Sequence, residues 1–282
     1  MRTACVRSRS SAARRGASMR LGASHAAAIW LPESLGLTTN GYISSMDAAQ
    51  VADGVFVAAR PVPVQVTPSR TAVVVVDMQN DFGSIGGMFE QAGVDISEIR
   101  ATIPSIAALI DSARRAGMKV GYLKMAFRDD LSDAGLPDSP NWLKHVPLKA
   151  GEHMVAPTGA ASRILVRDTW NTDIVDELRP RAEDVVLYKH RFSGFYQTEL
   201  DPILRGSGID TLLFVGATTS VCVESTFRDA MFRDFQCLIV EDCVAEPIGA
   251  DFPRSNHEAS LLVLQTLFGS VTDSKSVEAA FA

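Results

Sequence analysis

The chain has 282 residues, of which 46% are hydrophobic and 21% are charged, a composition typical of a globular protein that can bury a substantial core. No apolar run approaches the roughly 18 residues of a membrane-spanning helix. Four cysteines without a C-x-x-C pair exclude a disulfide-rich scaffold and a cysteine-based zinc finger. The net charge of −6 argues against nucleic acid as the main partner, because phosphate backbones require a basic surface.

The charge is distributed unevenly along the chain. Residues 1–45 contain six arginines and one acid, Glu33, so this arm carries about +5 and the remainder about −11. Three interpretations stay open: an organelle transit peptide, a disordered tail, or an upstream extension of a protein whose translation begins at Met46. We predict a basic arm over residues 1–60 and one folded domain over 61–282. We expect a cytoplasmic protein unless the arm directs it to an organelle.

From Pro61 onward, short β-branched runs alternate with amphipathic stretches. In chain order these patterns predict a strand at 71–76, a helix at 99–113 capped by Gly117, a strand at 119–124, a short helix at 173–178, a strand at 184–188, a helix at 200–205, a strand at 210–215, a helix at 221–232, a strand at 237–241, a helix at 256–268 and a strand at 270–271. Alternating strands and helices indicate an α/β fold whose mostly parallel, six-stranded sheet is covered on both faces. The long irregular stretch 129–169 is typical of a lid or an interface arm.

Three reactive side chains follow predicted strands. Asp77 follows the first strand, Lys189 the third, and Cys222 lies at a turn between the fourth strand and the next helix. In open α/β sheets, ligands bind at the carboxyl ends of the strands. Taken singly, each residue has an ordinary structural explanation: a buried small thiol, a turn carboxylate and a solvated lysine. Together at one sheet edge, they suggest nucleophilic catalysis.

The chemistry of this set suits a cysteine nucleophile. A helix N-terminus and a neighbouring ammonium are both expected to lower the pKa of the Cys222 thiol. A carboxylate within reach can take the thiol proton and later deliver it to a leaving amine. The turn at 216–220 can direct backbone N–H groups at one point, as an oxyanion hole requires.

Three segments resemble the isochorismatase-like cysteine hydrolases. They are Val-Asp-Met-Gln-Asn-Asp-Phe at 76–82, Arg-Phe-Ser-Gly-Phe at 191–195 after Lys189, and Gly-Ala-Thr-Thr-Ser-Val-Cys-Val-Glu-Ser-Thr at 216–226. The likeness runs from about residue 71 to 271. It implies a three-layer, Rossmann-like α/β/α fold and a catalytic triad of Asp77, Lys189 and Cys222. It also implies a cis peptide between Ala217 and Thr218, which would direct the Thr218 N–H toward an oxyanion beside that of Cys222.

The resemblance also separates groups within the family. Isochorismatases proper do not rely on the cysteine, so the intact Cys222 disfavours them. Nicotinamidases carry an Asp-x-His metal motif after the second strand, where this chain has Arg128-Asp129-Asp130, so we predict no metal and no other cofactor. The closest likeness is to ureido-cleaving amidohydrolases, although their Asn and Trp after the second strand are replaced by Met125 and Phe127, and a small hydroxyl residue of their lid by His145.

We therefore predict an amidohydrolase that cleaves a C–N bond of a small ureido or carbamoyl compound, ureidoacrylate-like, through a thioester. Such an activity belongs to pyrimidine degradation. Other small amides, nicotinamidase-like chemistry with a metal, and a non-catalytic scaffold stay open as alternatives. By family analogy we expect a homo-oligomer, a dimer or tetramer, with neither nucleic acid nor membrane as a partner. For Arg191 both a substrate carboxylate and a structural ion pair are open. The candidate substrate-binding residues are Gln79, Asn80, Phe82, Met125, Phe127, Trp142, His145, Arg191, Phe192 and Tyr196.

Overall fold

The computed structural model describes residues 54–251 and 253–282. Its centre is a six-stranded sheet in which every neighbouring pair of strands is parallel, in the order β10-β9-β8-β3-β4-β7. The predicted fold class is therefore confirmed. The strands of this sheet are β3 (Thr71–Val76), β4 (Lys119–Met125), β7 (Val185–Lys189), β8 (Thr211–Ala217), β9 (Gln236–Ala245) and β10 (Ser270–Thr272).

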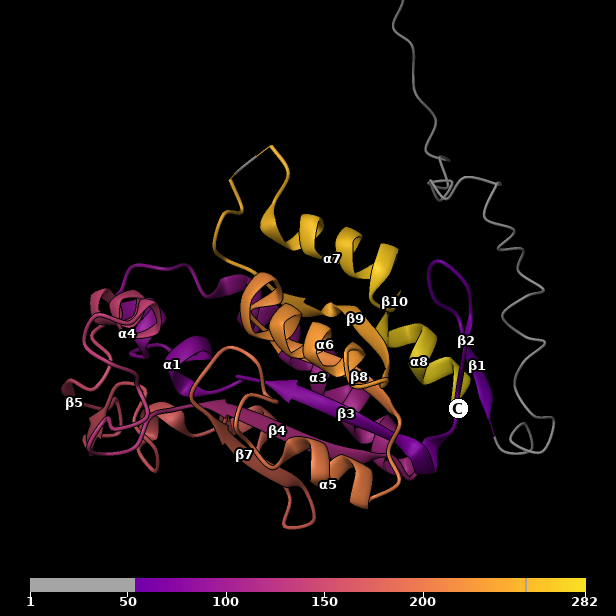
Figure 1. Ribbon diagram of the computed structural model, residues 1–282, viewed down its shortest axis with the longest axis horizontal. Coiled ribbons are helices and arrows are strands. Elements are labelled where there is room, and N and C mark those ends of the chain that lie inside the picture. The colour runs from indigo at the N-terminus through magenta and orange to yellow at the C-terminus, as the bar shows by residue number, and fades with distance from the viewer. Residues whose placement is uncertain (1–53, 252) are drawn as a thin grey trace, which may run out of the picture. The chain divides into compact units, whose positions relative to one another are not determined.

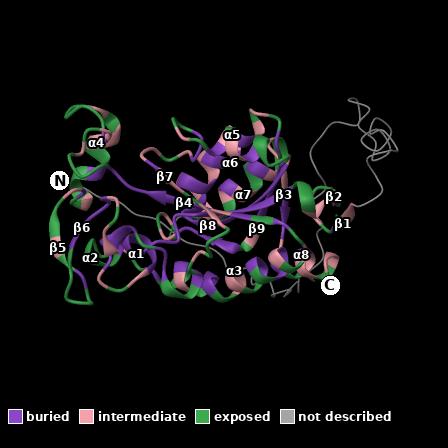
Figure 2. Ribbon diagram, turned by 90° about the horizontal axis from the view of Figure 1, so that it is seen from below, coloured by how far each residue is buried: buried purple, intermediate pink, exposed green. Residues whose placement is uncertain are grey.

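Helices cover both faces of the sheet (Figure 2). On one face lie α3 (Ser97–Arg115) and α8 (Ser274–Ala280), and on the other lie α5 (Leu200–Gly206), α6 (Glu224–Met231) and α7 (Asn256–Leu267). Every residue of β3 is buried, as expected for a central strand with helices on both sides. Side chains that alternate along the strands feed two separate apolar clusters, one beneath each helical layer.

The folded region begins before residue 61. A short hairpin of β1 (Val55–Val57) and β2 (Val64–Val66) lies in part within the segment that the sequence assigns to the arm. Arg60 forms an antiparallel bridge with Val271 of β10, and its guanidinium pairs with Glu241 at 2.6 Å. Residues 1–53 of the predicted arm lie outside the described residues. Pro61 and Pro63, which lie between the two strands, interrupt the sequence pattern that would indicate a hairpin.

Two predicted helices differ in the structure. The helix expected at 173–178 is a single 3-10 turn, Asp176–Leu178, preceded by another 3-10 turn at Trp170–Thr172. The helix expected at 221–232 begins as a wider π-helical turn, Thr219–Val223, and becomes α6 at Glu224. In the part of the chain that the structure describes, no helix has the length and apolar character needed to cross a membrane.

The long stretch between β4 and β7 forms an arm beside the carboxyl ends of the strands (Figure 1). It contains α4 (Pro140–His145), a 3-10 turn (Val146–Leu148) and the small hairpin β5 (His153–Val155) and β6 (Ala161–Arg163). Facing it are α1 (Asn80–Gly83) and α2 (Met88–Gln91). The buried carboxylate of Asp81 accepts hydrogen bonds from Leu165 N at 2.8 Å and from the Asn171 amide, and so ties this arm to α1.

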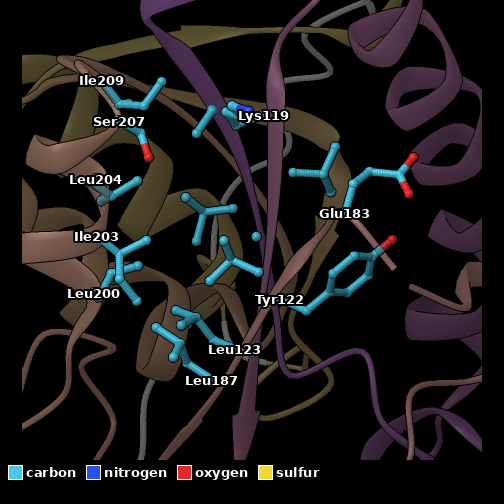
Figure 3. A pocket seen from close by; sticks show the side chains of 15 residues that line it. Lys119, Tyr122, Leu123, Glu183, Leu187, Leu200, Ile203, Leu204, Ser207 and Ile209 are labelled. Carbon is cyan, nitrogen blue, oxygen red and sulfur yellow. The ribbon is translucent and has the colours of Figure 1, made fainter. Parts of the chain in front are cut away.

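A small apolar hollow of about 90 Å³ separates α5 from the sheet (Figure 3). It lies toward the amino-terminal ends of β4 and β7, beside Lys119 and Glu183, and is enclosed by Leu123, Leu200 and Leu204. Gly121 contributes no side chain to it. The hollow is thus a gap in the packing of one layer, at the opposite ends of the strands from Asp77, Lys189 and Cys222.

Candidate active site

Two backbone features at the end of β3 place the first site carboxylate. Asp77 has φ +52°, in the left-handed region that aspartate tolerates better than most residues, and its N–H donates to Leu123 O at 2.9 Å. Beside it, Gly216 of β8 has φ +112°, and a Cβ there would lie 2.1 Å from Val76 O. Only glycine therefore allows β8 to approach β3 so closely just before the turn that carries Cys222.

The structure brings Asp77, Lys189 and Cys222 together from three different strand ends. Lys189 Nζ lies 2.8 Å from an Asp77 carboxylate oxygen and 3.3 Å from Cys222 Sγ. The Lys189–Asp77 contact is an ion pair by distance, and neither Asp77 carboxylate oxygen has a hydrogen-bond partner among the described residues. All three side chains are buried, and the exposed fraction of Cys222, the largest of the three, is 6%. The three side chains thus form a compact group that is closed off from solvent.

The protonation states differ from the sequence expectation for the thiol. Burial raises the pKa of Cys222, and the nearby Asp77 charge raises it further, while the Lys189 ammonium only partly opposes them. Burial also raises the pKa of Asp77, against the attraction of Lys189. For Lys189, burial disfavours the ammonium, but the charges of Asp77 and Cys222 prevail and the pKa is raised. The resting site is therefore a neutral thiol beside an ion pair.

The turn that carries Cys222 is shaped by a cis peptide bond and by hydrogen bonds within the turn. The Ala217–Thr218 peptide bond is cis, as the resemblance implies. Thr218 O accepts from the N–H groups of Val221 and Val223, each at 3.2 Å. Among the described residues, the Thr218 N–H has no backbone acceptor, and the Cys222 N–H belongs to the π-helical turn Thr219–Val223.

Glu246 is a site residue that the sequence reasoning missed. Its buried carboxylate accepts from Ser220 N at 2.9 Å and from the Ser220 hydroxyl, while Ile248 N donates to its other oxygen at 3.0 Å. His257 of α7 holds the neighbouring Thr219 hydroxyl at 3.0 Å. Glu246 directly follows β9, so an acid after a strand was a usable signal. The strand was expected to end at residue 241, which hid it.

Two of the predicted substrate-binding residues are engaged in the scaffold. The Gln79 amide spans the end of β4, donating to Met125 O at 2.9 Å and accepting from Met125 N at 2.8 Å. The Asn80 amide donates to Trp170 O at 2.7 Å and accepts from Ser84 Oγ at 2.6 Å. The Gln79 amide thus positions the backbone at the end of β4, and the Asn80 amide positions the backbone of the arm at Trp170. Phe82 packs edge-on against Phe89 in the core.

Met125 contacts Lys189, and the rings of Phe127, His145 and Phe192 pack against one another. Met125 Sδ lies 3.8 Å from Lys189 Nζ, and Phe127 follows it along the chain. The His145 ring lies edge-on to Phe127, with centroids 5.4 Å apart, and 5.8 Å from the ring of Phe192. Burial lowers the pKa of His145, and the charges of Lys189 and Arg191 lower it further, so this imidazole is neutral.

Three of the remaining candidate residues are less buried than the triad. Trp142 of α4 is partly buried against the core, while Phe192 and Tyr196 are exposed. The Arg191 carbonyl accepts a hydrogen bond from Lys189 Nζ at 3.3 Å. Within residues 54–251 and 253–282, no group of three or more His, Cys, Asp and Glu side chains is arranged to hold a metal ion.

The sequence matches the Isochorismatase domain over residues 71–276. Ureidoacrylate amidohydrolase RutB of Caulobacter segnis is 40% identical over 227 residues, which cover 80% of this chain and 92% of that protein. The enzyme of the same name from Agrobacterium fabrum is 41% identical over 213 residues, covering 76% and 90%. The chain thus belongs to the isochorismatase family.

Solved structures agree with this assignment. A cysteine hydrolase from Pseudomonas syringae pv. phaseolicola superposes with a TM-score of 0.62 at 29% identity, covering 77% of this chain and 96% of that one. N-carbamoylsarcosine amidase from Thermoplasma acidophilum superposes with a TM-score of 0.53 at 30% identity, covering 73% and 96%. These two curated relatives and this second structure are named for hydrolysis of ureido or carbamoyl compounds.

Proposed function

We propose that the chain is a cysteine-dependent amidohydrolase that cleaves a small ureido compound of the ureidoacrylate type. The observation that carries the proposal is the position of Lys189 Nζ, 2.8 Å from Asp77 and 3.3 Å from Cys222 in a buried site. Relatives at about 40% identity that carry the name ureidoacrylate amidohydrolase support the substrate class.

The first half of the reaction forms a thioester. Asp77 accepts the Cys222 proton as the thiolate attacks the ureido carbonyl carbon, and the carbonyl oxygen becomes an oxyanion. The backbone N–H groups of Thr218 and Cys222 stabilise that charge. When the tetrahedral intermediate collapses, the C–N bond breaks and Asp77 returns its proton to the leaving nitrogen. A carbamoyl thioester of Cys222 and a free amine or enamine result.

The second half regenerates the enzyme. Asp77 takes a proton from water, the hydroxide adds to the thioester, and carbamate leaves as the thiolate recovers its proton. Carbamate then decomposes to carbon dioxide and ammonia. Throughout both halves Lys189 remains an ammonium that stabilises the thiolate and holds the Asp77 carboxylate. The neutral resting thiol explains why the reaction needs a base as close as Asp77.

The test measures ammonia and carbon dioxide released by the purified protein from ureidoacrylate, biuret, N-carbamoyl amino acids, nicotinamide and simple amides. We expect turnover of a ureido compound that disappears in Cys222→Ser. Cys237→Ser is the matched control, because Cys237 is also buried but lies at the amino-terminal end of β9, opposite the end that borders the Cys222 turn. Turnover of simple amides alone would replace the ureido assignment with a general amidase. No turnover of any compound would contradict the enzyme assignment.

A further inference from the structure

Arg191 differs from the other arginines near the site in what its guanidinium contacts. Its Nη1 donates to two backbone carbonyls, Asp133 O at 2.8 Å and His190 O at 2.6 Å. No described carboxylate lies within ion-pair distance of it, so the structural ion pair considered from the sequence is absent from this part of the chain. Three arginines of the arm do each pair with an aspartate: Arg128, Arg163 and Arg167.

The contacts of Arg191 leave one edge of the guanidinium free. Both hydrogens of Nη1 are used by the two carbonyls. The Nε–H and the Nη2 hydrogens have no acceptor among the described residues, and neither nitrogen is sealed from solvent. Nε and Nη2 form the side-on edge of the group, whose two parallel N–H bonds match the oxygens of a carboxylate. Arg191 is thus anchored by one nitrogen and keeps a bidentate face open.

The triad and His145 carry no net negative charge that could balance the Arg191 guanidinium. The Lys189 ammonium and the Asp77 carboxylate neutralise each other at 2.8 Å. The Cys222 thiol and the His145 imidazole are neutral at rest. The Arg191 guanidinium, whose charge also acts on His145, therefore adds an uncompensated positive charge. The backbone carbonyl of Arg191 accepts a hydrogen bond from Lys189 Nζ at 3.3 Å. A substrate that brings one negative charge would balance the site.

We infer that Arg191 binds a carboxylate of the substrate side-on, so that the enzyme selects ureido acids over neutral ureas. This inference rests on the proposed function and adds to it the residue that binds the carboxylate of the substrate. The exposed ring of Tyr196, with its centroid 5.6 Å from the Arg191 guanidinium carbon, supports the orientation of that group from one side.

A purely structural role would have a different signature. Through Asp133 O, Arg191 also attaches the arm to β7, and loss of this anchor alone would impair every substrate equally. Carboxylate recognition instead predicts a loss confined to acidic compounds. Comparison of an acid with its neutral ester separates the two roles without dependence on the absolute activity of a variant.

The experiment measures equilibrium binding of ureidoacrylate and of its methyl ester to the full chain carrying Cys222→Ser, which prevents turnover. We expect the acid to bind at least about tenfold more tightly than the ester, in keeping with a hydrogen-bonded charged pair. Arg191→Gln should weaken binding of the acid by about 10- to 100-fold, leave the ester within threefold, and so remove the preference. Arg191→Lys, which keeps the charge but not the side-on edge, should lie between the two.

Arg128→Gln is the matched control, because it removes one positive charge from the same arm at a residue already paired with Asp133. It should leave both affinities unchanged. Equal binding of acid and ester, no binding of the acid, or equal losses for both compounds in Arg191→Gln would each overturn the inference. An acid preference that depends on Arg191, in a protein whose wild type releases no carbon dioxide, would instead contradict only the proposed function.

Discussion

The carboxylate of Glu246 holds Ser220 by both its backbone N–H and its hydroxyl, two residues before the Cys222 thiol. This pairing fixes the peptide plane in the middle of the turn between Thr218 and Cys222. Glu246 touches none of the reacting atoms. It acts on the reaction through the orientation of the turn.

Glu246→Gln should therefore lower kcat while leaving KM nearly unchanged. An amide presents only one acceptor oxygen, so it cannot keep all the bonds that the carboxylate now receives from Ser220 and Ile248. We expect kcat to fall by about 10- to 100-fold, the effect of a displacement of about 1 Å at a reacting group. Glu241→Gln is the control: it breaks the exposed ion pair between Glu241 of β9 and Arg60, and it should keep full kcat. An unaltered kcat in Glu246→Gln would refute this role.

Asp77→Asn should abolish hydrolysis yet speed the alkylation of Cys222. The negative charge of Asp77 raises the thiol pKa, so its removal lowers that pKa and increases the thiolate fraction at neutral pH. We expect iodoacetamide to modify Cys222 about tenfold faster or more at pH 7.5 in the variant. Mass spectrometry resolves the sites, with Cys237 and Cys243 as internal references. Slower alkylation of Cys222 in the variant would show that Asp77 does not suppress the thiolate.

On the acid side of the pH profile, activity should fall with a midpoint above the ordinary pKa of an aspartate. Catalysis needs the ionised Asp77 carboxylate, and burial raises its pKa despite the attraction of Lys189. Activity is therefore expected to fall, as the pH is lowered, at a value above the roughly 3.9 of an exposed aspartate. The measurement is kcat/KM between pH 3.5 and 8, with circular dichroism to verify folding. A limb centred at or below about pH 4 would contradict the direction of this shift.

Gly121→Ala should stabilise the protein by filling the hollow beneath α5. A Cβ at Gly121 would meet only Val185 O, at 3.9 Å, and the new methyl would face the apolar lining of the hollow. Reduced freedom of the unfolded chain and burial of the methyl together favour folding by about 0.5–1 kcal/mol. Gly216→Ala is the opposing control, since its Cβ would collide with Val76 O. Denaturant melts of both variants measure the effect, and a destabilised Gly121→Ala would show that the hollow cannot accept a methyl.

The sheet and the triad were predictable because their signals are local. A continuous β-branched run marks β3, and parallel strands deliver the residues that follow them to one edge. The roles of Gln79 and Asn80 were not predictable, because their amides bind the backbone of Met125 and of Trp170, which lies 90 residues further along the chain. Such partners carry no residue-specific pattern. The Glu246–Ser220 contact was not predictable for another reason. The two acids at 241 and 242 made β9 look as if it ended there, whereas it continues through Cys243–Ala245 to Glu246.

The site also has a consequence for folding. Asp77 follows β3, Lys189 ends β7 and Cys222 lies in the turn after β8, while β4 lies between β3 and β7 in the sheet. No single supersecondary unit of the chain contains all three, so the ion pair and the thiol meet only after four strands have assembled in register. Enzymatic activity should thus return during refolding only with the last of these docking events. The rate at which turnover returns during refolding would therefore measure the rate at which these four strands complete their assembly.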